Sequence, residues 1–217
     1  MGFSMPWSFL GNSSEKFGTY TWYNRRIEAI HSQASNLNTS VLKLALKAYM
    51  KAHQSHIGGS KEILTIIDYS KPSTERRLWV IDLRSKRVLY NTWVTHGKNS
   101  GGLSATSFSN QPGSLKSSFG VFLTEETYMG HVGYAVRLKG LESGINDNAY
   151  RRAVVVHGAW YADQDVAKRY GQLGRSFGCP AVSDKIARPL INTIKDQTVV
   201  FAYYPDRQWL RRSAFLA

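Results

Sequence analysis

The sequence predicts an α+β fold that is mainly β, with a helical segment at the N-terminus. Two observations support this prediction. Apolar residues recur at helical spacing through the first third of the chain, and from Glu62 onward they occur in short β-branched and aromatic runs. We therefore expect two parts: a helical segment over residues 1–58 and a β-rich domain over residues 59–217.

The helical segment is expected to hold two helices. An apolar stripe between Tyr23 and Ala34 predicts the first, with charged residues on its other faces. The second is expected from about Val41 to His53, with Thr39 or Ser40 as its cap. The glycines of IGGSK, residues 57–61, are expected to end it, because glycine commonly terminates helices.

Seven short runs after Glu62 predict strands, since each is rich in β-branched or aromatic residues and bounded by Pro, Ser, Lys or Gly. They are EILTIID, RLWVIDL, RVLYNTWVTHG, SFGVFLT, GYAVRL, RAVVVHG and TVVFAYY. A Gly/Ser/Asn-rich segment separates the third run from the fourth, over residues 98–118. It is too long for a hairpin turn, and ordered loops of this length commonly carry function.

Composition restricts the classes of function. The chain has 217 residues, with 28 Lys and Arg against 15 Asp and Glu, a net charge of +13. Such a surface attracts nucleic acid, acidic lipid or anionic cell-wall polymers, although positive charge also simply keeps proteins soluble. No apolar run reaches 18 residues, so we expect no membrane-spanning helix. The stretch MGFSMPWSFLGNSSEKFG lacks a basic region, so we expect no complete secretory signal in it.

The residues with the clearest chemical potential lie in one segment near the C-terminus. An expected strand over residues 152–156 ends at His157 and Gly158. Cys179, the single cysteine, lies between Gly178 and Pro180. A thiol beside an imidazole is an activated nucleophile, and a glycine-rich turn supplies backbone N–H donors for an oxyanion. Spacing alone leaves the alternative open, in which Cys179 is a core thiol and His157 a capping group.

These residues resemble the signature of the YkuD-like L,D-transpeptidase family, which is His-Gly followed some twenty residues later by Ser-His-Gly-Cys and then usually Arg. The matching positions are His157, Gly158, Ser176, Gly178 and Cys179. The sequence departs at Phe177, where the family usually has His, and at Ala181, where it usually has Arg. The departures resemble a divergent branch of murein L,D-transpeptidase catalytic-domain proteins. That resemblance extends over most of residues 40–204 and includes HGKNSGG, FSNQPGSLKSSFGVFLTEETYMG and GRSFGCPAV.

The resemblance implies a mixed β-sandwich or barrel of YkuD-like type, with residues 59–217 as the catalytic domain. It implies that Cys179 attacks the bond between an L-centre and a D-amino acid in a peptidoglycan stem peptide, forming a thioester. His157 would be base and then acid, oriented by a backbone carbonyl near Gly158, while the N–H groups of Gly178 and Cys179 hold the oxyanion. Transfer to an amine gives cross-linking, and transfer to water gives L,D-carboxypeptidase activity. The chemistry requires no metal and no cofactor.

Further residues are candidates around this centre. Ser176 is expected to shape the Cys179 loop, and Arg175 either clamps a substrate carboxylate or braces nearby carbonyls. Tyr128, His96 and His131 are candidates for substrate contacts, with packing or strand-terminal roles as the alternatives.

The expected partners are peptidoglycan stem peptides and anionic envelope polymers, in a periplasmic or otherwise exported location. A nucleic-acid platform is not expected, because the chain has no recognisable RNA-binding motif and no Lys/Arg run beyond pairs. A catalytically inactive wall-binding module stays open because of Phe177 and Ala181.

Overall fold

The computed structural model of the protein describes residues 15–217, and the expectation about a secretory signal falls largely on residues 1–14, outside this range. The elements are α1 (Tyr20–Gln33), α2 (Thr39–Gln54), β1 (Ile63–Asp68), β2 (Leu78–Asp82), β3 (Arg87–Thr92), β4 (Gly120–Gly130), β5 (Gly133–Gly140), β6 (Val155–Gly158), η1 (Trp160–Ala162), α3 (Gln164–Tyr170), β7 (Ala181–Val182), α4 (Asp184–Ile194), β8 (Val199–Tyr203) and α5 (Arg207–Arg212). Within residues 15–217 no helix is long and apolar enough to cross a membrane.

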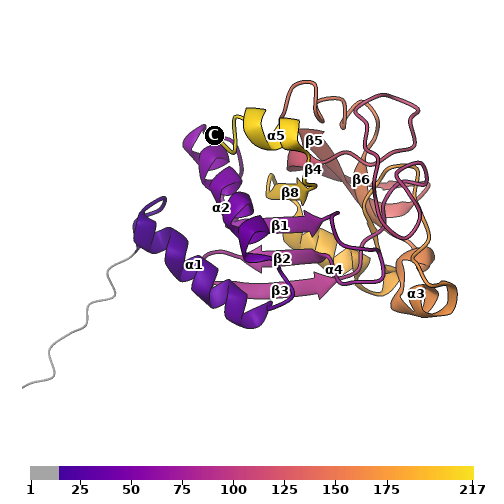
Figure 1. The fold of residues 1–217 in the computed structure, drawn as a ribbon, viewed down its shortest axis with the longest axis horizontal. Coiled ribbons are helices and arrows are strands. Elements are labelled where there is room, and N and C mark those ends of the chain that lie inside the picture. The colour runs from indigo at the N-terminus through magenta and orange to yellow at the C-terminus, as the bar shows by residue number, and fades with distance from the viewer. Residues whose placement is uncertain (1–14) are drawn as a thin grey trace, which may run out of the picture.

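A single eight-stranded sheet organises the molecule, in the order β3-β2-β1-β8-β4-β5-β6-β7. Neighbours are antiparallel except for the parallel pairs β1–β8 and β6–β7. Figure 1 shows the β1–β3 half lying across the view and the β4–β6 half turned away from it, so the sheet bends strongly along its length. The expected mixed architecture is confirmed, and all seven predicted strands are present.

The sheet is covered on both faces, which explains why its central strands are apolar throughout. All six residues of β1 are buried. One hydrophobic cluster joins alternate residues such as Leu64 and Phe201 to the apolar stripes of α1 and α2 and to Trp209 of α5. A second cluster joins the opposite faces of the same strands, such as Val200, to the stripe of α4. The helical segment and the β-rich part therefore share one core.

Two details of the helices differ from expectation. Asn38, rather than Thr39 or Ser40, caps α2, because its side-chain oxygen accepts hydrogen bonds from the Ser40 and Val41 backbone N–H groups. The structure also contains α4 and α5 in the region expected to be mainly β. α4 was not predicted because it contains Pro189, and proline removes a backbone donor and normally interrupts helices.

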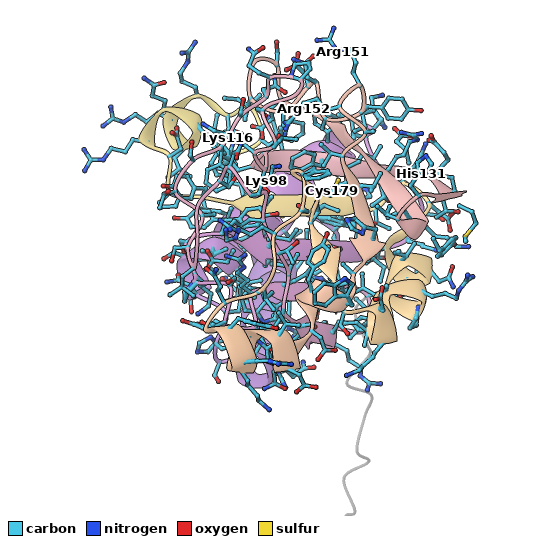
Figure 2. All side chains as sticks on the ribbon, turned by 90° about the vertical axis from the view of Figure 1, so that its right-hand side faces the viewer. Lys98, Lys116, His131, Arg151, Arg152 and Cys179 are labelled. Atoms are coloured by element: carbon cyan, nitrogen blue, oxygen red, sulfur yellow. The ribbon has the colours of Figure 1, made fainter. Side chains whose placement is uncertain are left out.

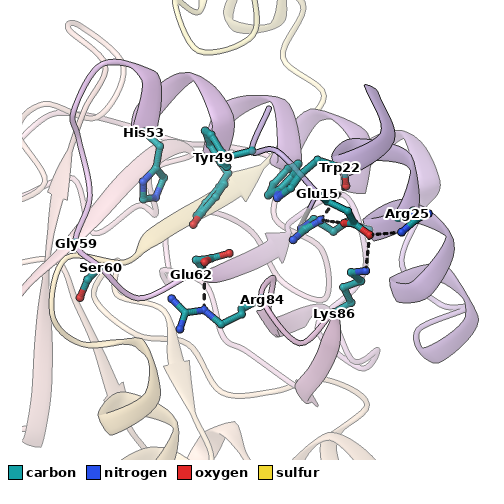
Figure 3. Close-up of a pocket in the computed structure, with 12 residues that line it drawn as sticks. Glu15, Trp22, Arg25, Tyr49, His53, Gly59, Ser60, Glu62, Arg84 and Lys86 are labelled. Carbon is teal, nitrogen blue, oxygen red and sulfur yellow. Dashed lines mark hydrogen bonds and ion pairs between the residues drawn. The ribbon is translucent and has the colours of Figure 1, made fainter. Parts of the chain in front are cut away.

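The start of α1 is fixed by a charge cluster remote from the cysteine. The Glu15 carboxylate accepts hydrogen bonds from Lys86, Arg25 and Arg26, each at 2.8 Å (Figure 3). The hydrogen bonds from Lys86 and Arg25 hold the pKa of Glu15 at about 2, so the carboxylate stays charged. A cavity of about 810 Å³ opens beside this cluster, with Tyr49 among the residues that line it.

Candidate active site around Cys179

His157 lies at the end of β6, where the short parallel pairing with β7 fixes its neighbours. It is paired with Ala181, and its backbone N–H donates to the Pro180 carbonyl at 3.4 Å. Cys179 immediately precedes Pro180. The two residues that the sequence singled out, 22 positions apart, therefore lie on adjacent segments of backbone.

The imidazole of His157 has a defined tautomer. Its Nδ1 lies 2.7 Å from the Gly158 carbonyl oxygen, and a carbonyl only accepts, so Nδ1 carries the proton. Nε2 makes no hydrogen bond within residues 15–217 and presents its lone pair. Burial lowers the pKa of His157 below its ordinary value, although the Gly158 carbonyl and Asp184 oppose the shift. The ring is therefore neutral at neutral pH.

A tight loop presents Cys179, and Ser176 holds it together. The Ser176 hydroxyl donates to the Cys179 carbonyl at 2.6 Å and accepts from the Gly178 N–H at 3.1 Å. Gly178 has φ +126°, and a Cβ there would lie 2.8 Å from the Lys116 carbonyl oxygen. The expected loop-shaping contact of Ser176 is thus present. The Gly178 N–H, expected to serve an oxyanion, is engaged by Ser176, whereas the Cys179 N–H makes no hydrogen bond within residues 15–217.

The thiol of Cys179 is half-buried and points to a backbone carbonyl. Sγ donates to the Ala153 carbonyl oxygen at 3.7 Å and has no hydrogen bond to His157. Ala153 has φ +53°, a left-handed conformation uncommon for alanine, which helps to set the direction of that carbonyl. Burial raises the pKa of the thiol, while a backbone hydrogen bond at Val155 and the Arg152 guanidinium oppose the rise. The resting Cys179 side chain is therefore a neutral thiol.

Arg152 ties the long loop between β3 and β4 to the cysteine. Its guanidinium donates to the carbonyl oxygens of Ser109 (2.5 Å) and Lys116 (2.6 Å) and to the hydroxyl of Ser118 (2.6 Å). From the same loop, the Ser117 hydroxyl donates to the Gly178 carbonyl at 3.0 Å. The segment 98–118 expected to be a functional loop is a loop, and it packs against the Cys179 turn.

His96 is buried inside this arrangement and is 1 % exposed. Nδ1 accepts from Arg77 at 2.8 Å, so Nε2 carries the proton and faces the Gly101 carbonyl at 3.4 Å. Burial and the Arg77 charge lower the pKa of His96 to about 4. In this structure His96 holds the surrounding backbone together and offers no free ring nitrogen to a substrate, because both nitrogens already have partners. Arg175, which is exposed, donates to the same Gly101 carbonyl at 3.2 Å.

Tyr128 and His131 come from the β4–β5 hairpin and differ in position. Tyr128 pairs with Ala135, and Ala135 pairs with His157, so Tyr128 shares a cross-strand row with His157 at about 10 Å, two strand spacings away. His131 lies in the exposed turn of the hairpin, outside that row, and Figure 2 shows it away from Cys179.

Two arginines near this site, Arg137 and Arg152, could not be identified from the sequence. Arg137 of β5 pairs with Val155 and forms an ion pair with Glu126 at 2.9 Å, beneath the Tyr128 ring. Arg152 begins the run RAVVVHG that leads to His157, but only the fold shows that its side chain reaches the loop packed against Cys179. Within residues 15–217 no cluster of three His, Cys, Asp or Glu side chains could hold a metal ion.

Comparison with known proteins decides the family. The family model described as L,D-transpeptidase catalytic domain matches residues 33–203, well over half of the chain. The chain belongs to this family. The resemblance stated from the His157 and Cys179 motifs is thereby confirmed, and the match begins at the end of α1, so it includes α2 of the helical segment.

Solved structures of L,D-transpeptidases also align with the chain. One from Mycobacterium smegmatis is 15 % identical, over 66 % of this chain and 59 % of its own, with a TM-score of 0.41. L,D-transpeptidase 1 of Mycobacterium tuberculosis is 15 % identical, over 65 % and 62 %, with a TM-score of 0.38. An L,D-transpeptidase from Stackebrandtia nassauensis is 12 % identical, over 83 % and 77 %, with a TM-score of 0.39. The chain spans about three fifths of the two mycobacterial proteins. No curated protein matches it.

Proposed function

We propose that the protein is an L,D-transpeptidase that uses Cys179 as its nucleophile and peptidoglycan stem peptides as its acyl donors. One observation carries the proposal. The β6–β7 pairing brings His157, with its Nε2 lone pair unused, to the backbone that leads out of Cys179. In our proposal this pairing of two successive strands assembles the residue pair that acyl transfer needs.

The first half of the reaction begins with a change in the direction of the thiol. Sγ leaves the Ala153 carbonyl and gives its proton to His157 Nε2 as it attacks the donor carbonyl. The Sγ–C bond forms, the amide C–N bond breaks, and His157 returns the proton to the leaving amine of the D-amino acid. The product is a thioester on Cys179.

The charge that develops on the donor carbonyl needs a backbone donor. The Cys179 N–H serves this purpose in our proposal, because the Gly178 N–H is already bonded to Ser176. Ser176 then acts indirectly, by fixing the loop so that the Cys179 N–H keeps its direction. Tyr128, in the row of His157, and exposed Arg175 are proposed to contact the donor peptide.

In the second half, an amine of a neighbouring stem attacks the thioester, the C–S bond breaks, and the amine proton passes through His157 to the thiolate. Water in place of the amine gives the L,D-carboxypeptidase outcome at the same site. Because the substrate belongs to the cell wall, we propose an exported location, periplasmic in a bacterium with two membranes. Anionic envelope polymers are proposed partners of the basic surface.

Mass spectrometry of purified muropeptides tests the proposal. The native chain and Cys179→Ala are incubated with the same muropeptides. Cross-linked dimers formed only by the native chain establish a transpeptidase, and trimmed monomers without dimers establish a carboxypeptidase. If the folded native chain gives neither with varied stems, the enzymatic proposal fails, and sedimentation with isolated cell wall then tests the inactive wall-binding alternative.

A further inference from the structure

Three of the segments that surround Cys179 contain no acidic residue. Residues 83–124, 148–162 and 166–183 have no Asp or Glu, although the chain has 15 such residues in all. The first segment supplies the loop under Gly178, the second supplies Arg152 and His157, and the third supplies Cys179 itself. Acidic residues lie next to these segments without belonging to them: Asp147 accepts a hydrogen bond from Asn110 of the first segment, and Asp184 adjoins Gly158.

Cations remain in those segments, and the fold places four of them at the site. We define the cationic rim as Lys98, Lys116, Arg152 and Arg175. Figure 2 shows Lys98, Lys116 and Arg152 on the same face as Cys179. Lys98 Nζ lies 4.7 Å from the ring centroid of Phe177, two residues before the cysteine, and the Lys116 carbonyl accepts from Arg152 at 2.6 Å.

No member of the cationic rim forms an ion pair within residues 15–217. Lys116 Nζ bonds only to the Ser107 hydroxyl, and Arg152 and Arg175 bond to carbonyls and hydroxyls. Elsewhere nine of the 28 Lys and Arg residues form ion pairs, among them Lys61 with Asp196, Lys71 with Glu75 and Arg84 with Glu62, so the rim differs from the other unpaired cations by its position at Cys179. A group of unpaired cations around an open nucleophile attracts anionic ligands and raises their local concentration.

We infer that the cationic rim makes the site selective for an acidic acyl donor, a stem-type peptide whose carboxylates outside the scissile bond are free rather than amidated. The inference rests on the proposed function and adds a preference within its substrate class. Exposed Lys98 and Arg175 pair with these carboxylates as the donor approaches. Arg152 adds its positive charge to the site while its hydrogen bonds hold the 109–118 loop in place.

The test compares two synthetic tetrapeptide donors that differ only in whether those carboxylates are free or amidated. At low ionic strength we expect kcat/KM for the free acid to exceed that for the amide by about tenfold, mainly through KM, because such contacts act before the chemical step. At about 0.5 M salt the ratio is expected to fall to about threefold or less, since exposed charges are screened.

The double variant Lys98→Gln/Arg175→Gln is expected to lose most of the preference without salt. Arg152 is left intact because it braces the loop. The matched control is Lys43→Gln/Lys47→Gln, which removes the same charge from exposed positions on α2 and is expected to keep the tenfold ratio. Equal rates on the two donors at low salt, or an unchanged ratio in the rim variant, overturn this inference and leave the proposed function standing. Turnover of neither donor overturns both.

Discussion

The imidazole Nδ1 of His157 donates to the carbonyl oxygen of Gly158, its own neighbour in the chain, at 2.7 Å. A carboxylate takes the corresponding place in the Ser-His-Asp arrangement and stabilises the imidazolium that forms there. A neutral carbonyl orients the ring without adding a negative charge, so burial dominates and the pKa of His157 falls. Glycine at 158 also lets α4 approach, because a Cβ there would lie 2.5 Å from Asp184 Oδ1.

This relationship predicts the pH dependence of the reaction. His157 must be neutral to accept the thiol proton, and its lowered pKa places the acid limb of kcat/KM below pH 6.5, the ordinary histidine value. Replacement His157→Gln is expected to reduce kcat by about 100- to 10,000-fold and to abolish that limb. Steady-state rates from pH 4.5 to 8 measure both. An acid limb above pH 6.5 would contradict the account.

Ser176→Ala is expected to lower kcat more than it raises KM. The change removes the group that joins the Gly178 N–H to the Cys179 carbonyl, and it leaves two buried polar groups unpaired at a cost of about 1–3 kcal/mol. Steady-state kinetics and urea unfolding check the two effects. Ser32→Ala, at an exposed serine that bonds only within α1, is the control. Native kcat in Ser176→Ala would show that the loop holds its shape without the serine.

Gly178→Ala tests whether the Cys179 loop needs a residue without a side chain at this position. The substitution puts a Cβ 2.8 Å from the Lys116 carbonyl at φ +126°, so we expect at least about a tenfold loss of kcat/KM. Gly144→Ala is the matched control, because Gly144 also has positive φ (+74°) but a Cβ there meets nothing within 4 Å. Thermal denaturation and kinetics of both variants make the comparison. Equal, small effects would mean that close approach of Lys116 is unimportant.

His96 predicts a pH dependence of stability. Its folded pKa of about 4 lies below the ordinary value of 6.5, so the unfolded chain binds the extra proton first and stability falls as the pH drops from 6.5 toward 4. The loss for this one group is on the order of 3 kcal/mol. Urea unfolding at pH 7 and pH 4.5 measures it. In His96→Gln, which retains His157, the difference between the two pH values is expected to shrink; an unchanged difference would assign it to other groups.

Much of the fold could be predicted from the sequence because it follows local patterns of apolar residues. The apolar stripes of α1 and α2 and the runs of the seven predicted strands follow periodicity and β propensity. Of the elements that were not predicted, α4 and β7 were missed for identifiable reasons. α4 has an apolar stripe at helical spacing, but Pro189 stands inside it. β7 has only two residues, too short for any pattern to predict, yet it is the strand that brings Cys179 to His157.

The residue types of the candidate site follow from the sequence motif, but their geometry does not. The motif predicted His157, Gly158, Ser176 and Cys179, whose contacts with one another depend on short-range backbone turns. His96 looked the same as His157 in sequence, a His-Gly at the end of a strand run. Only the tertiary position of Arg77, which fills the space beside His96, distinguishes the two. The reach of Arg152 to the 109–118 loop likewise arises from packing alone.

The central claim is a thioester on Cys179, and intact-protein mass spectrometry tests it most directly. The native chain and Cys179→Ala are each incubated with a stem tetrapeptide without an acceptor amine, then quenched in acid. The account predicts that the native chain gains the mass of the donor minus its terminal D-amino acid, that peptide mapping places the adduct on Cys179, and that Cys179→Ala gains none. Product formation at the native rate by Cys179→Ala, or an adduct on another residue, would contradict it.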